Sequence, residues 1–283
     1  MSEDDHDEHD DDEHVSASGR PMSFLAAAAW TIGIGLSARI AVEVTAGARP
    51  GAEDDLVNLT ACYVLACSAL LFGMLRLYSP HASLRDVLGM RATSPSGVLL
   101  SIAGGVVLYP ALDLIDTYVT KRFPPSAEET ERVGRLMQAT TIGQRVVLLV
   151  SLMVVFPFFE EIFFRGGLFR GLRRARPEGL AVIASAAFYA MSHGDPRVLA
   201  TTFILGLFTA WLRGRSGSVL PSIAANVAYN AVPLLPIALG KGDVNLGPKV
   251  AIAGAIAAAV FAWGAGMIFA SDLRAERGRL LDA

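Results

Sequence analysis

Eight apolar runs separated by short polar segments constrain the fold of this chain more than any other feature. Their residue ranges are 23–46, 56–78, 96–118, 145–170, 179–194, 197–213, 219–240 and 249–271. A helix needs about 20 apolar residues to cross the hydrocarbon core of a bilayer. Only α-helices and closed barrels satisfy the backbone inside lipid. The runs therefore predict an all-α fold, a polytopic transmembrane helix bundle of about eight spans, or seven if the two short runs do not both cross.

The composition agrees with a membrane environment. Hydrophobic residues make up 53% of the 283 residues, and only 18% are charged. Soluble domains carry more charge than this. The two cysteines, Cys62 and Cys67, lie in one apolar run and are predicted to be buried hydrophobic side chains. They indicate neither a disulfide framework nor a zinc site.

The N-terminal segment differs from the rest of the chain. Its first fourteen residues hold nine acids and three of the five histidines, a composition that cannot bury enough apolar surface to fold. We predict a disordered acidic tail over 1–21, with a metal- or partner-binding tail as the alternative. The transmembrane domain is predicted over 22–276, with its core motifs within 145–240, and a short C-terminal tail over 277–283.

The basic residues between the runs predict the orientation. With eight spans, thirteen arginines lie on the side of the N-terminus and eight lysines or arginines on the other. The side richer in these residues is usually cytoplasmic, so both termini are expected there. The loop over 119–144 is predicted to contain an interfacial amphipathic helix, because Val133, Leu136 and Met137 share one face.

Two adjacent carboxylates and an arginine lie among four phenylalanines in the fourth run. Glu161 and Arg165 are four residues apart and can pair on one helix face. Glu160 points about 100° away from Glu161, which leaves it unpaired in an apolar setting that suits a general base. A structural ion pair without chemistry is the simpler alternative, but the second, unpaired glutamate disfavours it.

His193 ends the fifth run, one turn after Tyr189 and just before Pro196. A lone histidine at a helix end is more often a cap than a catalyst. However, Glu160 and His193 both lie roughly 24–25 Å along antiparallel helices from the turn near Pro177, at 1.5 Å per residue. Their matched depth predicts a Glu–His pair acting on one water.

Asn226 and Asn230 share a face of the seventh run at a similar depth. Their amide groups can stabilise an oxyanion, although interhelical hydrogen bonding is the usual role of asparagine in membrane bundles. Arg39 and Glu43 are interpreted as a structural pair, and Asp113 and Asp116 as near-interface residues. The sequence contains no HExxH zinc helix and no Gly-x-Ser-x-Gly elbow.

Taken in order, these motifs resemble those of the CPBP intramembrane proteases, also called the ABI or CAAX prenyl endopeptidase type 2 family. The resemblance covers roughly residues 85–240 and rests on three motifs on separate apolar helices. They are Glu160-Glu161-x-x-x-Arg165, an aromatic-x-x-x-His ending at His193, and a residue-x-x-x-Asn ending at Asn230.

This resemblance implies a hydrolase, a metal-independent intramembrane glutamic endopeptidase with no cofactor. By similarity, Glu160 activates water with the help of His193, Glu161 and Arg165 shape the site, and Asn230 binds the oxyanion. Two positions depart from the family pattern: Tyr189 stands where phenylalanine is common, and Asn226 where histidine is common. An amide at 226 donates a hydrogen bond but carries no proton, which raises the chance of a pseudoenzyme.

The expected partners are a membrane-associated peptide or protein substrate and the lipid bilayer, without nucleic acid. The arginine-rich, lysine-poor composition favours a bacterial inner membrane protein. The sequence leaves the oligomeric state open. A non-catalytic scaffold that binds a partner in the same cavity is the main alternative. A transporter is disfavoured, because the polar residues of 160–230 have no counterpart in 23–118, and transporters often consist of two similar halves.

Overall fold

The computed structural model describes residues 19–80, 83, 85, 89, 93–241 and 247–281, and the secondary structure in this part of the chain is helical throughout. The elements are α1 (Phe24–Ala48), η1 (Ala52–Asp54), α2 (Leu56–Tyr78), α4 (Pro95–Arg122), α5 (Ala127–Met137), α6 (Ile142–Leu148), η2 (Leu149–Val155), α7 (Phe156–Glu161), η3 (Ile162–Leu168), α8 (Phe169–Arg173), α9 (Glu178–Ser192), α10 (Leu199–Ser216), α11 (Leu220–Ala238) and α12 (Pro248–Leu281). The predicted all-α fold class is confirmed. Most of the predicted acidic tail, residues 1–18, lies outside the described residues.

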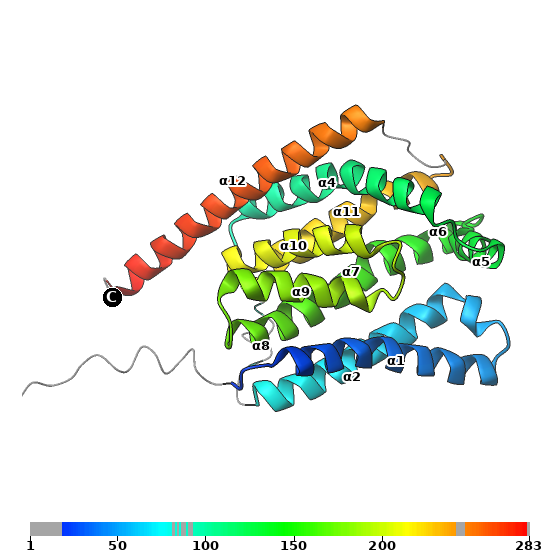
Figure 1. The fold of residues 1–283 in the computed structure, drawn as a ribbon, viewed down its shortest axis with the longest axis horizontal. Coiled ribbons are helices and arrows are strands. Elements are labelled where there is room, and N and C mark those ends of the chain that lie inside the picture. Colours follow the sequence, from blue (N-terminus) through cyan, green and yellow to red (C-terminus); the bar gives the residue numbers. More distant parts are fainter. Residues whose placement is uncertain are drawn as a thin grey trace, which may run out of the picture.

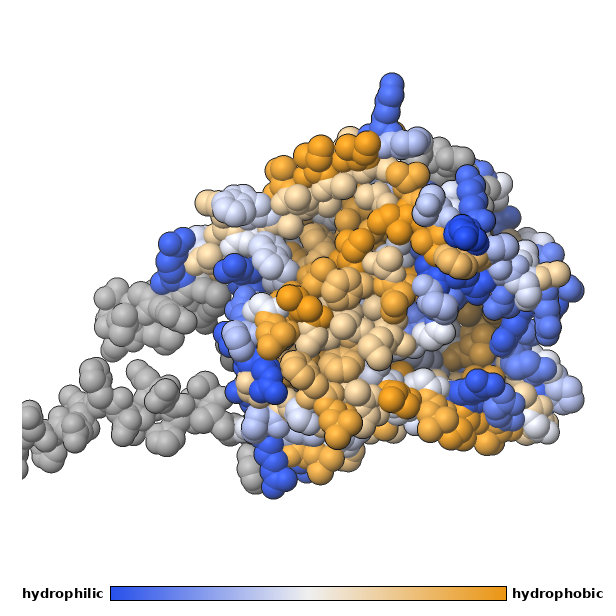
Figure 2. All heavy atoms as spheres, in the orientation of Figure 1, coloured by the Kyte–Doolittle hydropathy of each residue, from blue (hydrophilic) through white to orange (hydrophobic). Residues whose placement is uncertain are grey.

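Within the part of the chain that the structure describes, six helices are long and apolar enough to cross a membrane: α1, α2, α4, α11, the first 25 residues of α12, and the continuous helix Ile142–Arg173. The chain is therefore a multi-pass integral membrane protein. α9 is apolar but short, and α10 is not among the six, so the count of eight spans stays a prediction. Apolar side chains form a broad band across the middle of the molecule, and hydrophilic ones gather at both ends of the helices (Figure 2).

Short polar segments begin and end the helices by defined local chemistry. Ser23 caps α1 and Asp55 caps α2, each accepting a hydrogen bond from a backbone N–H of the first turn. Ser126 and Thr141 form reciprocal capping boxes at the starts of α5 and α6. α10 ends at Gly217, whose φ of 65° requires a residue that tolerates the left-handed region. α1 begins and α12 ends at the same end of the bundle (Figure 1).

The helix from Ile142 to Arg173 is not regular along its length. Two π-helical segments, η2 and η3, flank the six residues of α7 that end with Glu160 and Glu161. Wider turns of this kind are frequent at functional sites because they change which residues share a helix face. The two carboxylates therefore lie where the backbone departs from the α-helical repeat.

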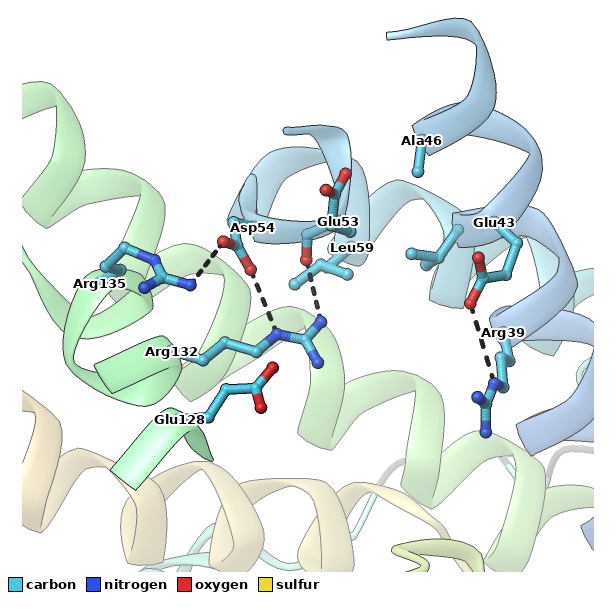
Figure 3. A pocket seen from close by; sticks show the side chains of 10 residues that line it. Arg39, Glu43, Ala46, Glu53, Asp54, Leu59, Glu128, Arg132 and Arg135 are labelled. Atoms are coloured by element: carbon cyan, nitrogen blue, oxygen red, sulfur yellow. Dashed lines mark hydrogen bonds and ion pairs between the residues drawn. The ribbon is translucent and has the colours of Figure 1, made fainter. Parts of the chain in front are cut away.

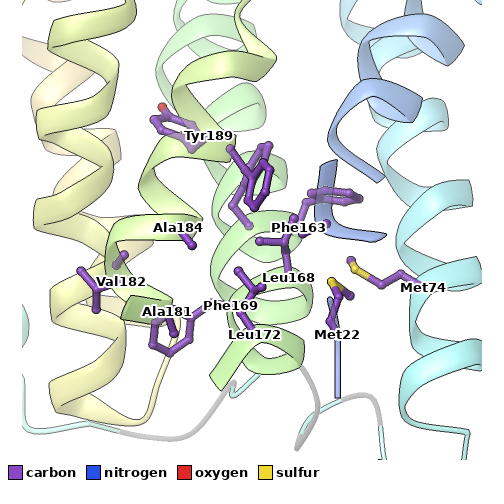
Figure 4. Close-up of a cluster of buried hydrophobic side chains, with 14 of the residues drawn as sticks. Met22, Met74, Phe163, Leu168, Phe169, Leu172, Ala181, Val182, Ala184 and Tyr189 are labelled. Atoms are coloured by element: carbon purple, nitrogen blue, oxygen red, sulfur yellow. The ribbon is translucent and has the colours of Figure 1, made fainter. Parts of the chain in front are cut away.

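The bundle contains two packed regions, one of which includes the C-terminal half of the helix Ile142–Arg173. This half buries Phe163, Phe164, Leu168, Phe169 and Leu172 in an apolar cluster with side chains of α1, α2, α9 and α10 (Figure 4). On the other side of the bundle, α4 packs against α11 and α12. Small residues allow the close approach there: a Cβ at Gly105 would lie 2.2 Å from the Ala225 carbonyl oxygen, and one at Gly254 would lie 2.4 Å from that of Val107. Such glycine contacts are typical of helix packing in lipid.

We predict that Gly105→Ala destabilises the bundle, because its methyl group would overlap the backbone of α11. Overpacking of this size lowers the melting temperature by roughly 3–10 °C in a protein of this length. Thermal unfolding in detergent measures the effect, with Gly35→Ala on α1 as the control, since nothing lies within 4 Å of a Cβ there. Equal melting temperatures for the two variants would contradict the close packing of α4 on α11.

Candidate active site

An ion pair without solvent contact lies at the junction of α7 and η3. Arg165 Nε is 3.2 Å from Glu161 Oε2, and both side chains are 0% exposed. Arg165 Nη2 donates to the Gly206 carbonyl at 3.1 Å and to Thr209 Oγ1 at 2.6 Å. The guanidinium also lies 4.3 Å from the centre of the Tyr189 ring, a favourable cation–π distance. The pair predicted from the four-residue spacing is present, and α10 supplies part of its surroundings.

The neighbouring carboxylate, Glu160, has different surroundings. The Tyr189 hydroxyl donates to Glu160 Oε2 at 3.1 Å, and His193 Nε2 lies 4.0 Å from Glu160 Oε1. The Glu160 side chain is 15% exposed and that of His193 is 27% exposed. Glu160 is thus the carboxylate that solvent can reach, and it faces the histidine that the matched helix depths predicted.

The histidine ring is oriented by the backbone of its own helix. His193 Nδ1 lies 3.0 Å from the Tyr189 carbonyl oxygen. A carbonyl oxygen only accepts, so this contact requires the proton on Nδ1. In the neutral ring Nε2 then carries the lone pair and points toward Glu160 Oε1. Tyr189 therefore positions both partners, Glu160 through its hydroxyl and His193 through its carbonyl group.

The two asparagines of α11 complete the group. Asn226 Nδ2 donates to Glu161 Oε1 at 2.9 Å. Asn230 Nδ2 lies 2.9 Å from both the backbone oxygen and the Oδ1 of Asn226. Hydrogen bonds, the Glu161–Arg165 ion pair and the contact of Arg165 with the Tyr189 ring thus join residues of α7, η3, α9 and α11 in one polar network, in agreement with their similar predicted depths.

A cavity of about 820 Å³ reaches this network from one end of the bundle. His193 lines it together with the end of α4, the start of the segment before α5, and the loop between α9 and α10; the other lining residues are Val119, Phe123, Pro124, Glu129, Gly194, Asp195, Pro196 and Arg197. The cavity therefore opens onto the histidine side of the Glu160–His193 pair.

Several neighbours of the site were not predicted. Thr209 and Gly206 bind Arg165, and Arg213 Nε donates to the Arg165 carbonyl at 3.1 Å. Thr209 lies in the apolar run 197–213, which also contains Thr201 and Thr202, so no signal in the sequence singled it out. Ser222 was not predicted either, and its buried hydroxyl donates to the Thr209 carbonyl at 2.7 Å.

Other polar residues singled out in the sequence lie apart from this network. Arg39 and Glu43 approach to 4.0 Å, and their side chains are 81% and 71% exposed. Asp113 accepts from Tyr109, and Asp116 accepts from Thr201. Among the described residues, no group of three or more His, Cys, Asp or Glu side chains is arranged to hold a metal ion.

Comparison with known proteins assigns the part of the chain that carries this network. Residues 142–232 match the family described as Type II CAAX prenyl endopeptidase Rce1-like. This segment belongs to the Rce1-like family. It runs from the start of α6 into α11 and contains Glu160, Glu161, Arg165, Tyr189, His193, Asn226 and Asn230. No curated protein and no solved structure gives a significant match to the chain.

The Rce1-like segment thus includes the complete polar network, and it excludes α1, α2, α5 and α12. The family supports a CAAX-protease-type membrane endopeptidase. The roles of the individual side chains rest on their geometry, which separates a buried structural pair from a reachable carboxylate.

We predict that Glu161→Gln strongly destabilises the protein whereas Glu160→Gln does not. The first substitution leaves the Arg165 guanidinium buried without a counter-charge, which costs roughly 3–5 kcal/mol. The second keeps an acceptor for the Tyr189 hydroxyl. Thermal unfolding in detergent measures the stability of both variants. Equal stability of the two variants would contradict the assignment of a structural role to Glu161 and not to Glu160.

Proposed function

We propose that this protein is an intramembrane glutamate-dependent endopeptidase that hydrolyses a peptide bond of a membrane-associated protein or peptide. The observation that supports it most is the contrast between the two adjacent carboxylates. Glu161 is neutralised by Arg165, while Glu160 is 15% exposed, oriented by Tyr189 and opposed to His193. A base held in this way beside a cavity is what water activation needs.

The distance between Glu160 and His193 suits a single water molecule. With the proton on Nδ1, His193 Nε2 and an ionised Glu160 Oε1 are both acceptors, so they do not bond to each other directly. A water about 2.8 Å from each spans their 4.0 Å separation with an angle of roughly 90° at its oxygen, so both hydrogen bonds are slightly bent. Its two O–H groups then point at Oε1 and Nε2, and its lone pair faces the cavity.

Hydrolysis then proceeds in two steps at these atoms. The water oxygen bonds to the carbonyl carbon of the peptide while its proton passes to Glu160, which leaves a tetrahedral oxyanion. The C–N bond breaks as the amine nitrogen takes a proton delivered from Glu160 through His193 Nε2. The products are a carboxylic acid and an amine, and the side chains return to their starting protonation states.

Asn226 and Asn230 are the proposed donors to the oxyanion. In the structure their amides form hydrogen bonds with Glu161 and with each other. Asn230 makes both of its contacts to Asn226 and is partly exposed, so it can turn an N–H toward the substrate without uncovering Glu161. The amide of Asn226 is neutral, so it can donate to Glu161 without adding charge to the Glu161–Arg165 pair, which is already neutral as a whole.

The proposed setting is a bacterial inner membrane, with both termini in the cytoplasm. The greater number of arginines at the end of the bundle where α1 begins favours this orientation. The cavity beside His193 lies at the opposite end of α9 from Pro177, so the site opens toward the non-cytoplasmic side. The proposed substrate is therefore a protein or peptide tail that is reached from that side.

We predict that Glu160→Gln abolishes a specific cleavage. Glutamine preserves the shape of the side chain and the contact with Tyr189 but accepts no proton. Loss of general base catalysis lowers the rate of hydrolysis by roughly 10²–10⁴-fold. Mass spectrometry of membrane-protein termini, in cells with wild type and with this variant, measures the effect and names the substrate. A new terminus is expected with wild type alone.

The stability of Glu160→Gln in detergent is the control, because the variant must be present and folded. Identical terminal profiles, combined with a phenotype for loss of the whole protein, would contradict catalysis. That outcome would favour a scaffold that binds its partner in the same cavity.

We predict that Asn230→Ala lowers kcat by roughly 10²–10³-fold, the effect of losing one oxyanion donor, with little change in KM. Purified protein and the substrate found above measure it. Ser222→Ala, at a buried hydroxyl one turn before Asn226 that bonds only to a backbone carbonyl in α10, is the matched control on the same helix. An unchanged kcat for Asn230→Ala would assign both asparagines to helix packing alone.

A further inference from the structure

The amphipathic helix α5 lies at the end of the bundle where α6 begins (Figure 1). None of its eleven residues is buried. Non-helical segments flank it, residues 123–126 before and 138–141 after. It is therefore held by contacts at its surface rather than by insertion into the apolar core.

One end of α5 is anchored to the turn between α1 and α2. Arg132 Nε and Arg135 Nη2 bind the two oxygens of Asp54 at 3.2 and 2.9 Å, and Arg132 Nη2 donates to the Glu53 carbonyl at 3.1 Å (Figure 3). Hydrogen bonding from Arg135 holds the pKa of Asp54 below its usual range. Met137 adds an apolar contact with a cluster of α6 and α11. Several polar contacts and one apolar contact therefore hold this end of α5.

The other end of α5 is fastened to the loop that follows His193. Arg197 Nη1 and Nη2 each bind one oxygen of Glu129 at 3.2 Å, and the same guanidinium holds Asp195. A hydrogen bond from the Ser126 backbone, with that of Arg197, lowers the pKa of Glu129. The carboxylate is thus ionised at neutral pH. The Glu129 side chain is 53% exposed, so water competes for this contact.

α5 also separates two polar cavities. Glu129 lines the 820 Å³ cavity that reaches His193. Glu128, Arg132 and Arg135 line a second cavity of about 730 Å³, together with Arg39 and Glu43 of α1 and five other residues (Figure 3). Charges at the depth of Arg39 and Glu43 are tolerated where a cavity holds water, and Figure 2 shows a hollow bordered by hydrophilic atoms at this end of the molecule.

We propose that α5 is a gate over the Glu160–His193 site, which turns on its anchor at Asp54 and is latched by the contact between Glu129 and Arg197. In the closed arrangement described here, α5 divides the two cavities. When the latch opens, they join into one cleft wide enough for an extended polypeptide to reach Glu160. The purpose of this movement rests on the proposed endopeptidase function, but the movement itself does not.

Chemical labelling tests the gate without using activity. The reporter is His193→Cys, in a background of Cys62→Ala and Cys67→Ala that removes both native cysteines. A charged maleimide that does not cross membranes should react faster with the reporter when the cavity, which already leaves the His193 side chain 27% exposed, opens further to water. We expect Glu129→Gln and Arg197→Gln each to raise the labelling rate about two- to fivefold, the factor expected from an exposed ion pair.

Glu128→Gln is the matched control, because Glu128 is the preceding residue of α5 and takes no part in the latch. It should leave the labelling rate unchanged. High salt should accelerate labelling of the reporter with the latch intact and have little effect once the latch is removed. Equal rates in all variants would overturn the gate and make α5 a fixed wall.

Cleavage by the otherwise wild-type site gives the second readout. A short bis-maleimide joining Glu129→Cys to Arg197→Cys, in the same cysteine-free background, should abolish cleavage. The same pair treated with a mono-maleimide should remain active. Full activity of the cross-linked protein would refute the gate. If the uncrosslinked protein cleaves nothing, the proposed function fails, and the labelling rates still decide whether α5 moves.

Discussion

The ion pair between Glu161 and Arg165 is the interaction on which the site depends. Both side chains have no solvent contact, so neither charge is tolerable without the other. The pair draws in a carbonyl and a hydroxyl of α10, the face of the Tyr189 ring, and the amide of Asn226. These partners belong to three other helices, so the electrostatic demand of one pair fixes how α9, α10 and α11 meet the helix that carries it.

The same demand explains why adjacent glutamates behave differently. Helical rotation turns Glu160 away from the guanidinium of Arg165, toward α9 and the cavity. There the hydroxyl of Tyr189 takes one carboxylate oxygen and leaves the other facing His193. A partly exposed carboxylate thus lies one residue from a fully buried one, and the Glu161–Arg165 pair holds the backbone from which the Glu160 side chain projects.

Much of this arrangement is predictable from the sequence because lipid restricts the options. The apolar runs coincide with the observed helices to within a few residues, except that α12 continues ten residues beyond the end of its run at 271; α2 matches its run, 56–78, at both ends. The helical rise per residue, counted from the turns between antiparallel helices, predicted similar depths in the membrane for Glu160, His193 and Asn226. Helix spacing likewise gave the pairing of Glu161 with Arg165.

The remaining features depend on tertiary contacts that periodicity does not encode. The π-helical segments around α7 change which residues share a face, and no local motif marks them. Thr209 is one polar residue among many in α10 until Arg165 is placed beside it. The amides of Asn226 and Asn230 were expected to face a substrate, yet their hydrogen bonds to each other and to Glu161 follow from the meeting of two helices.

The asparagine at 226 fits this electrostatic arrangement on physical grounds. Its donor contact to Glu161 is neutral, so the unit of Glu161, Arg165 and Asn226 keeps a net charge of zero at any pH at which the pair is ionised. An imidazolium at the same position would place a second positive charge beside the buried guanidinium, where the low local dielectric strengthens repulsion. With an amide there, the proposed mechanism leaves His193 as the group that exchanges a proton with Glu160. The acid–base chemistry that we propose is then confined to the side of the network where His193 lines the cavity.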